Sequence, residues 1–196
     1  MKLKLYYDPG TTMQALNYLA SHAPDKTLDK VDALKLLFLA DRDHLRKYSR
    51  TITGDRYHAR KFGPVAVKAN RLIEKMASTD GGKGSCISVA RGTGRRISIR
   101  PRRLAAMDKL SQTDVESLDC ALAQWPDHPD LVGYTHRFPE WRKHKAALDA
   151  GARSVTMDFT DFFLPCKNPS DEYCQADAGL VSMSREIYEE DSRWFQ

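Results

Sequence analysis

Apolar residues between Val31 and Tyr48 recur every three or four positions, which is the period of an α-helix. Six residues share one face: Val31, Leu34, Phe38, Asp41, Leu45 and Tyr48. We expect this helix to be capped by Thr27, with Asp29 in its first turn, and to end near Tyr48. Such a stripe has to be buried, so the other elements must pack around it.

Asp41 lies inside this apolar stripe. A buried carboxylate is costly unless it is hydrogen-bonded or paired, so a partner must lie nearby. The obvious partners are downstream: Tyr57, His58, Arg60 and Lys61. Asp41 either belongs to a binding or catalytic cluster or braces the loop Arg50–Gly63 against the helix, and bracing is the commoner role for a lone buried aspartate.

Other helices are predicted by capping patterns, prolines and further stripes. Thr11 and Gln14 have the spacing of a capping box, as do Thr113 and Glu116, and Pro64 suits a first helical position. The predicted helices are Thr11 to about His22, Gly63-Pro64 to the break at Asp80, Thr113–Trp125, Pro129–His136, Pro139–Leu148, and a weak amphipathic helix near the end of the chain. Its apolar face would contain Leu180, Met183, Ile187, Tyr188, Trp194 and Phe195.

A β-hairpin is predicted between the third and fourth helices. Ile87 and Val89 alternate with polar residues, as do Ile97 and Ile99, so one face must lie on the helices. The surrounding residues 81–107 contain seven basic residues and no acid. Guanidinium groups of this kind pair with phosphates or with an acidic protein, although a merely solvated hairpin is an equally good interpretation.

Together these patterns predict a mainly α fold: a compact helical domain of about six helices with a small β-hairpin, plus a C-terminal amphipathic extension. Residues 1–150 would form the domain, and residues 151–196 a partly packed, acidic extension. A composition of 41% hydrophobic and 29% charged residues is ordinary for a folded globular chain.

Several classes of protein are disfavoured. No apolar run approaches the roughly 20 residues of a membrane-spanning helix, and no leader pattern is present, so we expect a cytoplasmic protein without membrane contact. Cys86, Cys120, Cys166 and Cys174 form no CxxC pair, which favours free thiols. The weaker alternative is a zinc site formed by Cys166 and Cys174 with His136 or His144, and we expect neither metal nor cofactor.

An enzyme is also disfavoured. Asp41 and Asp43 would point about 200° apart on a helix, and the sequence lacks HExxH and GxSxG. Gly81-Gly82-Lys83-Gly84 lacks the order of a phosphate-binding loop, so it indicates a flexible turn. The enzymatic alternative is a hydrolase or nuclease that uses Asp41 and His58.

Three stretches carry a resemblance to a known family. Leu34–Asp41 is leucine-rich and ends in Ala-Asp, Ile52–Tyr57 has the pattern Ile-x-Gly-x-x-Tyr, and Phe62–Val65 contains Gly-Pro-Val. Leu131–His136, followed by Trp141, is a weaker match. In order and spacing the chain resembles the Panacea domain of SocA-like antitoxins over roughly residues 11–150. It departs from the family pattern at Phe38, where tyrosine is commoner, and at Phe62, where a more polar residue is usual; we expect both on the core side.

The resemblance implies a mostly helical antitoxin that neutralises a cognate toxin by direct protein–protein binding, and an adaptor role that delivers the toxin to a ClpXP-type protease. We expect the contacts to come from the loop Arg50–Gly63 and the basic hairpin, and a nucleic-acid-binding regulator that uses this hairpin is the alternative. The candidate partner-binding residues are Thr53, Asp55, Arg56, Tyr57, His58, Lys61, Arg91, Arg95 and Arg96. The residues assigned to the structural motif are Asp41, Gly54, Gly63, Pro64, Thr135, His136 and Trp141.

Overall fold

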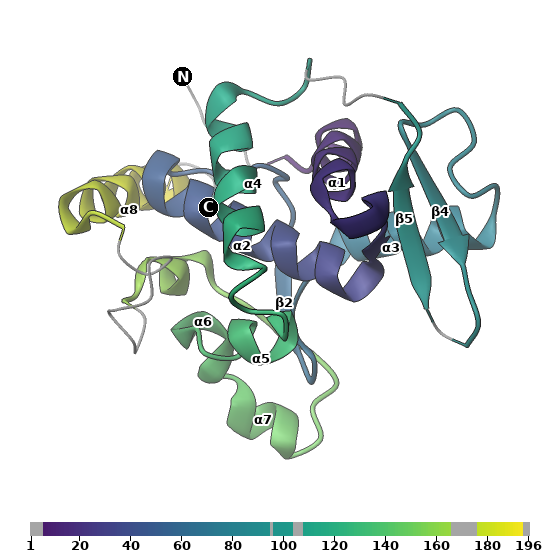
Figure 1. Ribbon diagram of the computed structural model, residues 1–196. Coiled ribbons are helices and arrows are strands. Elements are labelled where there is room, and N and C mark those ends of the chain that lie inside the picture. The colour runs from purple at the N-terminus through teal and green to yellow at the C-terminus, as the bar shows by residue number, and fades with distance from the viewer. Residues whose placement is uncertain (1–5, 95, 104–107, 166–175, 194–196) are drawn as a thin grey trace.

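The computed structural model describes residues 6–94, 96–103, 108–165 and 176–193. These residues form a mainly helical fold with small antiparallel sheets, as expected, but with eight α-helices among them rather than about six (Figure 1). The helices are α1 (Pro9–His22), α2 (Lys30–Tyr48), α3 (Val67–Ser78), α4 (Gln112–Gln124), α5 (Leu131–Thr135), α6 (Pro139–Arg142), α7 (Lys145–Asp149) and α8 (Ala178–Arg193), with 3-10 turns η1 (Pro24–Lys26) and η2 (Phe159–Phe163). The predicted helix Pro139–Leu148 is therefore two short helices.

Two three-stranded antiparallel sheets flank the helices. The first has the order β1-β5-β4, and its strands are β1 (Leu28–Asp29), β5 (Ile97–Pro101) and β4 (Ile87–Arg91). The second has the order β3-β2-β6, and its strands are β3 (Gly63–Ala66), β2 (Tyr57–Arg60) and β6 (Val155–Thr156). Val89 lies opposite Ile99, and both are buried, which confirms the predicted hairpin and its inward apolar face. The second sheet was not predicted.

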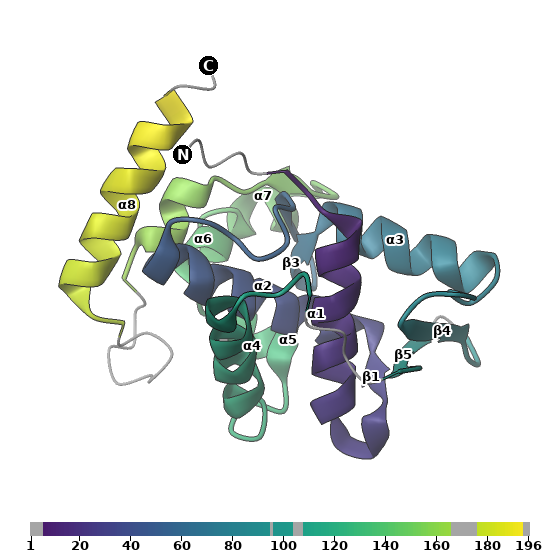
Figure 2. The same cartoon turned by 90° about the horizontal axis from the view of Figure 1, so that it is seen from above.

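Helix α2 passes through the middle of the molecule, with α4, α8 and the second sheet arranged around it (Figures 1 and 2). Residues 33–46 are all buried, so this helix is enclosed on every side, including its polar positions. The predicted stripe is correct from Leu34 to Leu45. At the ends of the helix it fails, because Val31 is 41% and Tyr48 37% exposed.

The caps of the first two helices differ from the prediction. Asp8, not Thr11, caps α1, because its Oδ1 accepts the Gly10 N–H at 2.7 Å. Gln14 instead binds Asp108, at 2.6 Å from Nε2 to Oδ1. Asp29, not Thr27, caps α2, because its Oδ1 accepts the Val31 N–H at 2.8 Å. In both cases an aspartate two or three residues from the predicted threonine provides the cap, because its carboxylate accepts amide N–H groups at the start of the helix at least as well as a hydroxyl does.

The capping box of α4 is shifted by two residues from the prediction. Ser111 and Asp114 cap the helix reciprocally, in place of Thr113 and Glu116. Thr113 Oγ1 is instead 3.1 Å from the buried ring of His44. Both pairs consist of a hydroxyl residue followed three positions later by an acidic residue. The contact of Thr113 with His44 in α2 decides which pair caps the helix.

Gly63-Pro64 does not begin a helix. Gly63 has φ +91° and starts the returning strand of the hairpin β2–β3, in which Pro64 lies opposite Ala59. A proline is tolerated in an edge strand because it has no N–H to leave unpaired. Helix α3 starts at Val67, and its first amides are capped from a distance: Asp55 accepts the N–H groups of Lys68 and Ala69 at 3.0 and 2.7 Å.

Residues beyond 150 contribute to the core. Strand β6 pairs with β2, and Phe162 in η2 is fully buried. Helix α8 packs on α2 and η2 through Val181 and Ser184. Its inner face therefore differs from the predicted one, since Leu180, Met183 and Ile187 point outward; Trp194 and Phe195 lie outside the described residues. The division at residue 150 stays a prediction.

Candidate partner-binding site

Asp41 ties the loop after α2 onto the helix. Its carboxylate accepts the N–H groups of Ile52 and Thr53 at 2.8 and 3.0 Å. It also accepts the hydroxyls of Thr53 and Tyr57, at 2.5 and 2.7 Å. Asp41 is fully buried; burial raises its pKa, and these hydrogen bonds oppose that shift. Of the four expected partners, Tyr57 is the one the structure places on this carboxylate.

Several predicted contact residues are inside the protein. Thr53, Asp55 and Tyr57 are each 1% exposed, so their side chains cannot reach a partner. Thr53 and Tyr57 serve Asp41, and Asp55 caps α3. These three polar residues of the loop Arg50–Gly63 face inward, where Thr53 and Asp55 satisfy amides of the loop and of the next helix.

The outward part of this segment is small. Arg56 and Lys61 are exposed, and His58 is partly buried with Nδ1 2.9 Å from Ser154 Oγ. Burial and the charges of Arg60 and Arg71 lower the pKa of His58. Since Tyr57 and His58 point to opposite faces of β2, the structure does not bring His58 to Asp41, as the hydrolase alternative requires.

Phe62 occupies the tip of the β2–β3 turn and is 67% exposed. This corrects the expectation that it lies on the core side. Lys61 Nζ is 6.0 Å from the centre of its ring, which is a cation–π contact at the outer limit of range. The turn residues of a tight hairpin project beyond the sheet. Gly63, directly after Phe62, was the sequence signal for such a turn and thus for the exposure of Phe62.

Residues of the structural motif hold this turn from below. Lys35 Nζ donates to the Pro64 carbonyl at 2.7 Å. A Cβ at Gly63 would lie 2.8 Å from Lys35 Nζ and 2.9 Å from Thr135 Oγ1, so any other residue would force these side chains to shift. Lys35 is 2% exposed, and burial lowers its pKa to about 7.

The other end of the turn is attached to α6. Trp141 Nε1 donates to the Arg60 carbonyl at 3.0 Å, and the Trp141 ring stacks on His136 with centroids 3.7 Å apart. The motif stretches that are separated in the sequence therefore meet around the β2–β3 hairpin. They fix the backbone on both sides of Lys61 and Phe62.

Two buried arginines of α2 were missed by the sequence reasoning. Arg42 Nε is 2.5 Å from Glu140 Oε1, and both side chains are fully buried. Arg46 donates to the carbonyls of Phe162 and Leu164 at 2.9 and 3.1 Å. Their signal was indirect: a helix that is apolar all round is buried all round, so its charged residues are buried too.

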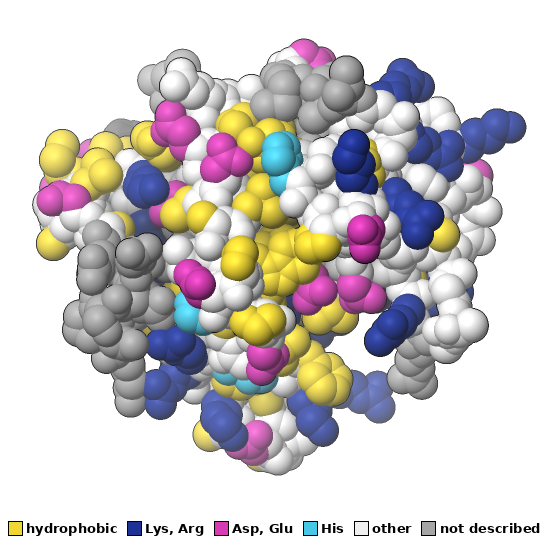
Figure 3. Space-filling view, viewed as in Figure 1, with side chains coloured by type: hydrophobic (Ala, Val, Ile, Leu, Met, Phe, Trp, Pro, Cys, Tyr) yellow, Lys and Arg dark blue, Asp and Glu magenta, His cyan; other side chains and the backbone are white. Residues whose placement is uncertain are grey.

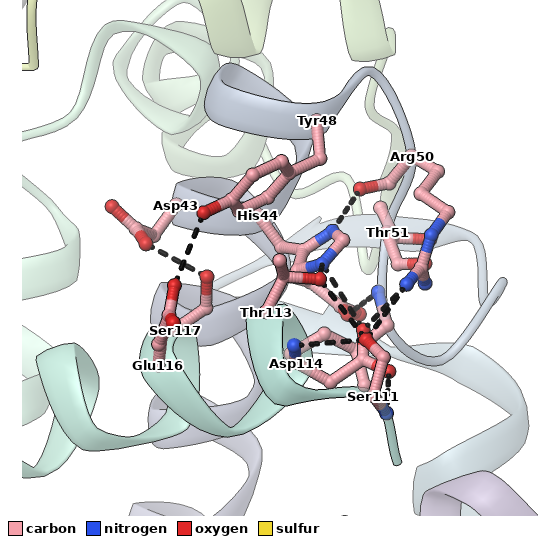
Figure 4. Close-up of polar contacts among 12 residues, drawn as sticks. Asp43, His44, Tyr48, Arg50, Thr51, Ser111, Thr113, Asp114, Glu116 and Ser117 are labelled. Carbon is pink, nitrogen blue, oxygen red and sulfur yellow. Dashed lines mark hydrogen bonds and ion pairs between the residues drawn. The ribbon is translucent and has the colours of Figure 1, made fainter. Parts of the chain in front are cut away.

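A polar network joins α2 to α4 (Figure 4). His44 Nδ1 is 2.9 Å from the Arg50 carbonyl, while its Nε2 is 3.1 Å from both Thr113 Oγ1 and Asp114 Oδ1. Burial would raise the pKa of Asp114, but hydrogen bonds from His44 and Ser111 and the charge of Arg50 lower it to about 2. Carboxylate and hydroxyl share one ring nitrogen, so the arrangement lacks the geometry of a catalytic triad.

No candidate metal cluster appears among the residues that the structure describes. Cys86 and Cys120 are free thiols, and burial raises the pKa of Cys120 to about 11. Cys166 and Cys174, and with them the alternative zinc site, lie outside the described residues.

The basic hairpin forms a positively charged region over β4 and β5, seen at the right of Figure 3. Much of its charge is engaged within the protein: Arg91 lies 3.1 Å from Glu74, Arg100 donates to Thr27, and Arg102 donates to the Gly81 carbonyl. Arg96 is exposed, and Arg95 lies outside the described residues. The structure therefore does not join the hairpin arginines and the β2–β3 turn into one site.

The family model described as antitoxin SocA-like, Panacea domain matches residues 34–142 of this chain, which is more than half of its length. The chain belongs to this family. The match begins within α2 and ends at α6, so it is narrower than the range of about 11–150 that the resemblance implied. No curated protein and no solved structure matches.

The Panacea segment contains every motif residue around the β2–β3 turn and also the basic hairpin. It leaves out α1, η1, β1, α7, β6, η2 and α8. None of the helices in the described part of the chain is both long and apolar enough to cross a membrane.

Proposed function

We propose that this chain is a cytoplasmic antitoxin that neutralises a cognate protein toxin by direct binding and not by catalysis. Membership of the Panacea family supports the antitoxin role. The observation that carries the binding site is the exposure of Phe62 on a turn that the family motif fixes in place. Phe62 and Lys61 are the central contacts, with Arg56 as a further positive group.

The geometry suits recognition because the turn is organised before any partner arrives. Lys35 holds the Pro64 carbonyl, and Trp141 holds that of Arg60, so little backbone entropy is lost when Phe62 enters a pocket. Large aromatic side chains in a fully desolvated centre contribute most of the energy of many interfaces. With Lys61 beside it, Phe62 fits an apolar pocket with an acidic rim on the toxin.

Delivery of the bound toxin to a ClpXP-type protease is the further step that the family resemblance implies. It depends on toxin binding, so it predicts that the toxin is degraded faster in cells that contain this chain. The nucleic-acid alternative is less well supported, since several hairpin arginines already have partners within the protein.

The experiment is co-expression with the product of the small gene that neighbours the antitoxin gene. The chain should restore growth and co-purify with that product. Phe62→Ala should weaken the measured affinity by about 30-fold, which is the loss of about 2 kcal/mol expected for an aromatic hot spot, and should leave the unfolding transition unchanged.

Val31→Ser is the matched control, because it removes another exposed apolar side chain, in the first turn of α2, that is not part of the β2–β3 turn. It should bind like the wild type. If no neighbouring product rescues growth or co-purifies, the antitoxin proposal is wrong. If the toxin binds but Phe62→Ala is silent, only the assignment of the surface is wrong.

A further inference from the structure

Helix α8 presents a second apolar surface, outside the segment that the family model covers. Leu180, Met183 and Ile187 are spaced by three and four residues and are 40%, 62% and 45% exposed. Figure 3 shows hydrophobic side chains with acidic ones beside them at the left edge, where Figure 1 places α8. The helix thus has an outward stripe, which we call the α8 stripe.

The orientation of α8 is set by its opposite face. Val181 is 8% and Ser184 2% exposed, and the ring of Tyr188 lies 5.7 Å from that of Phe163. Beside Val181 and Tyr188 the helix turns a serine inward, while three large apolar side chains point outward. A helix with a single buried face would not leave such side chains exposed, so the outward face indicates a second apolar environment.

Acidic residues border the stripe. Glu186 and Glu190 follow Met183 by three and seven positions, so they lie along its side. Arg185 pairs with Glu189 at 2.7 Å, whereas neither Glu186 nor Glu190 forms an ion pair within the described part of the chain. Carboxylates near the C-terminal end of a helix also oppose its dipole, and a cationic partner would relieve that repulsion.

A second copy of this chain suits the stripe less well than a different protein. Two α8 stripes facing each other would place like charges together. Contact between α8 and the basic hairpin of another copy would join two different patches, and such head-to-tail contacts propagate into chains unless they close into rings.

We infer that the α8 stripe is a second docking surface for the cognate toxin and that it packs against an apolar groove rimmed by lysine or arginine. This inference rests on the proposed antitoxin function. It follows the helix-in-groove mode, in which apolar anchors at i, i+3 and i+7 give affinity and flanking charges give orientation. Because α8 lies outside the family segment, it gives this chain a contact that the Panacea motif does not supply.

The test measures the affinity of the full chain for the neighbouring gene's product by biolayer interferometry. Met183→Glu should weaken binding at least tenfold. Ser182→Glu, which adds the same charge to an exposed position away from the stripe, should bind like the wild type. The double variant Glu186→Lys/Glu190→Lys should bind more weakly at 50 mM than at 300 mM NaCl relative to wild type, since its electrostatic attraction has become repulsion.

Thermal unfolding of each variant separates docking from folding. If Met183→Glu lowers the transition temperature more than Ser182→Glu does, the affinity of Met183→Ser is used to test the inference, because this variant removes the apolar contact without adding charge. Wild-type affinity in a folded Met183 variant overturns the inference while leaving the antitoxin function intact. Light scattering that shows a wild-type dimer, lost in Met183→Glu with toxin affinity unchanged, also overturns it, because the occupant is then a second copy.

Discussion

At the scale of single residues, the buried polar groups of α2 show what a one-dimensional pattern can reveal. The burial of Asp41 and its need for a partner were predicted because it interrupts one apolar stripe. Lys35 and Arg42 fall on other faces, and a single-stripe interpretation assigns those faces to solvent. The run Leu34–Ala40 contains apolar residues on all sides of the helix, so burial of Lys35 was predictable from it. The acceptors, Pro64 and Glu140, come from distant segments and were not predictable.

Lys35 makes the stability of the protein depend on pH. Its folded pKa is about 7, against an ordinary value of 10.5. Below pH 7 both the folded and unfolded states are protonated, and the cost of the buried charge is fully present. Between about pH 7 and 10 the folded state releases this proton while the unfolded chain keeps it, so stability rises with pH. Relative to Lys35→Met, the wild type should gain about 2 kcal/mol between pH 6.5 and 8.5.

Urea unfolding of both proteins at the two pH values measures this gain. Lys61→Met is the control, because Lys61 is exposed, and its pH dependence should follow that of the wild type. Parallel pH curves for the wild type and Lys35→Met would show that Lys35 is not titrating in the folded protein.

At the scale of elements, the short strands β2 and β3 show where local signals mislead. Gly63-Pro64 is a favourable start for a helix, yet it begins a strand. The decisive partners are remote: Asp55 supplies the cap of α3, and Lys35 and Thr135 leave no room for a side chain at Gly63. The hairpin β4–β5 was predicted correctly because its two strands and turn are contiguous and its alternation is complete.

Gly63 should therefore be sensitive to substitution for two separate reasons. Gly63→Ala places a Cβ on a residue with φ +91° and within 3 Å of Lys35 Nζ and Thr135 Oγ1. Gly84→Ala has a similar φ of +82° but open space around the new atom. We expect about 1 kcal/mol of destabilisation for Gly84→Ala and about 3 kcal/mol for Gly63→Ala, by urea unfolding. Equal losses of stability in the two variants would mean that Lys35 and Thr135 move aside for the new Cβ without a free-energy penalty.

At the scale of the whole molecule, the helical class and the hairpin followed from the sequence, whereas the packing partners of the C-terminal part did not. After Gly151 the spacing of apolar residues becomes irregular and the composition more acidic, which suggested an extension outside the domain. The structure places β6 beside β2, Phe162 in the core and the carbonyls of Phe162 and Leu164 on Arg46. A two-residue strand and a 3-10 turn are too short to have a detectable period, so the sequence predicted an extension that is partly packed but not where it packs.

These contacts predict where the chain can be shortened. A fragment of residues 1–150 would expose the edge of β2, remove Phe162 from the core and leave the buried Arg46 without its two carbonyl acceptors. Loss of a large core aromatic alone costs about 3–5 kcal/mol, which is comparable to the whole stability of many domains. We expect fragment 1–150 to lack a cooperative thermal transition and fragment 1–165 to retain one at a reduced temperature. Circular dichroism melting of both fragments checks this, and a cooperative transition in fragment 1–150 would place the domain boundary at residue 150 after all. Fragment 1–165 would also keep the Phe62 turn while lacking the α8 stripe, so its affinity for the toxin separates the contributions of the two proposed surfaces.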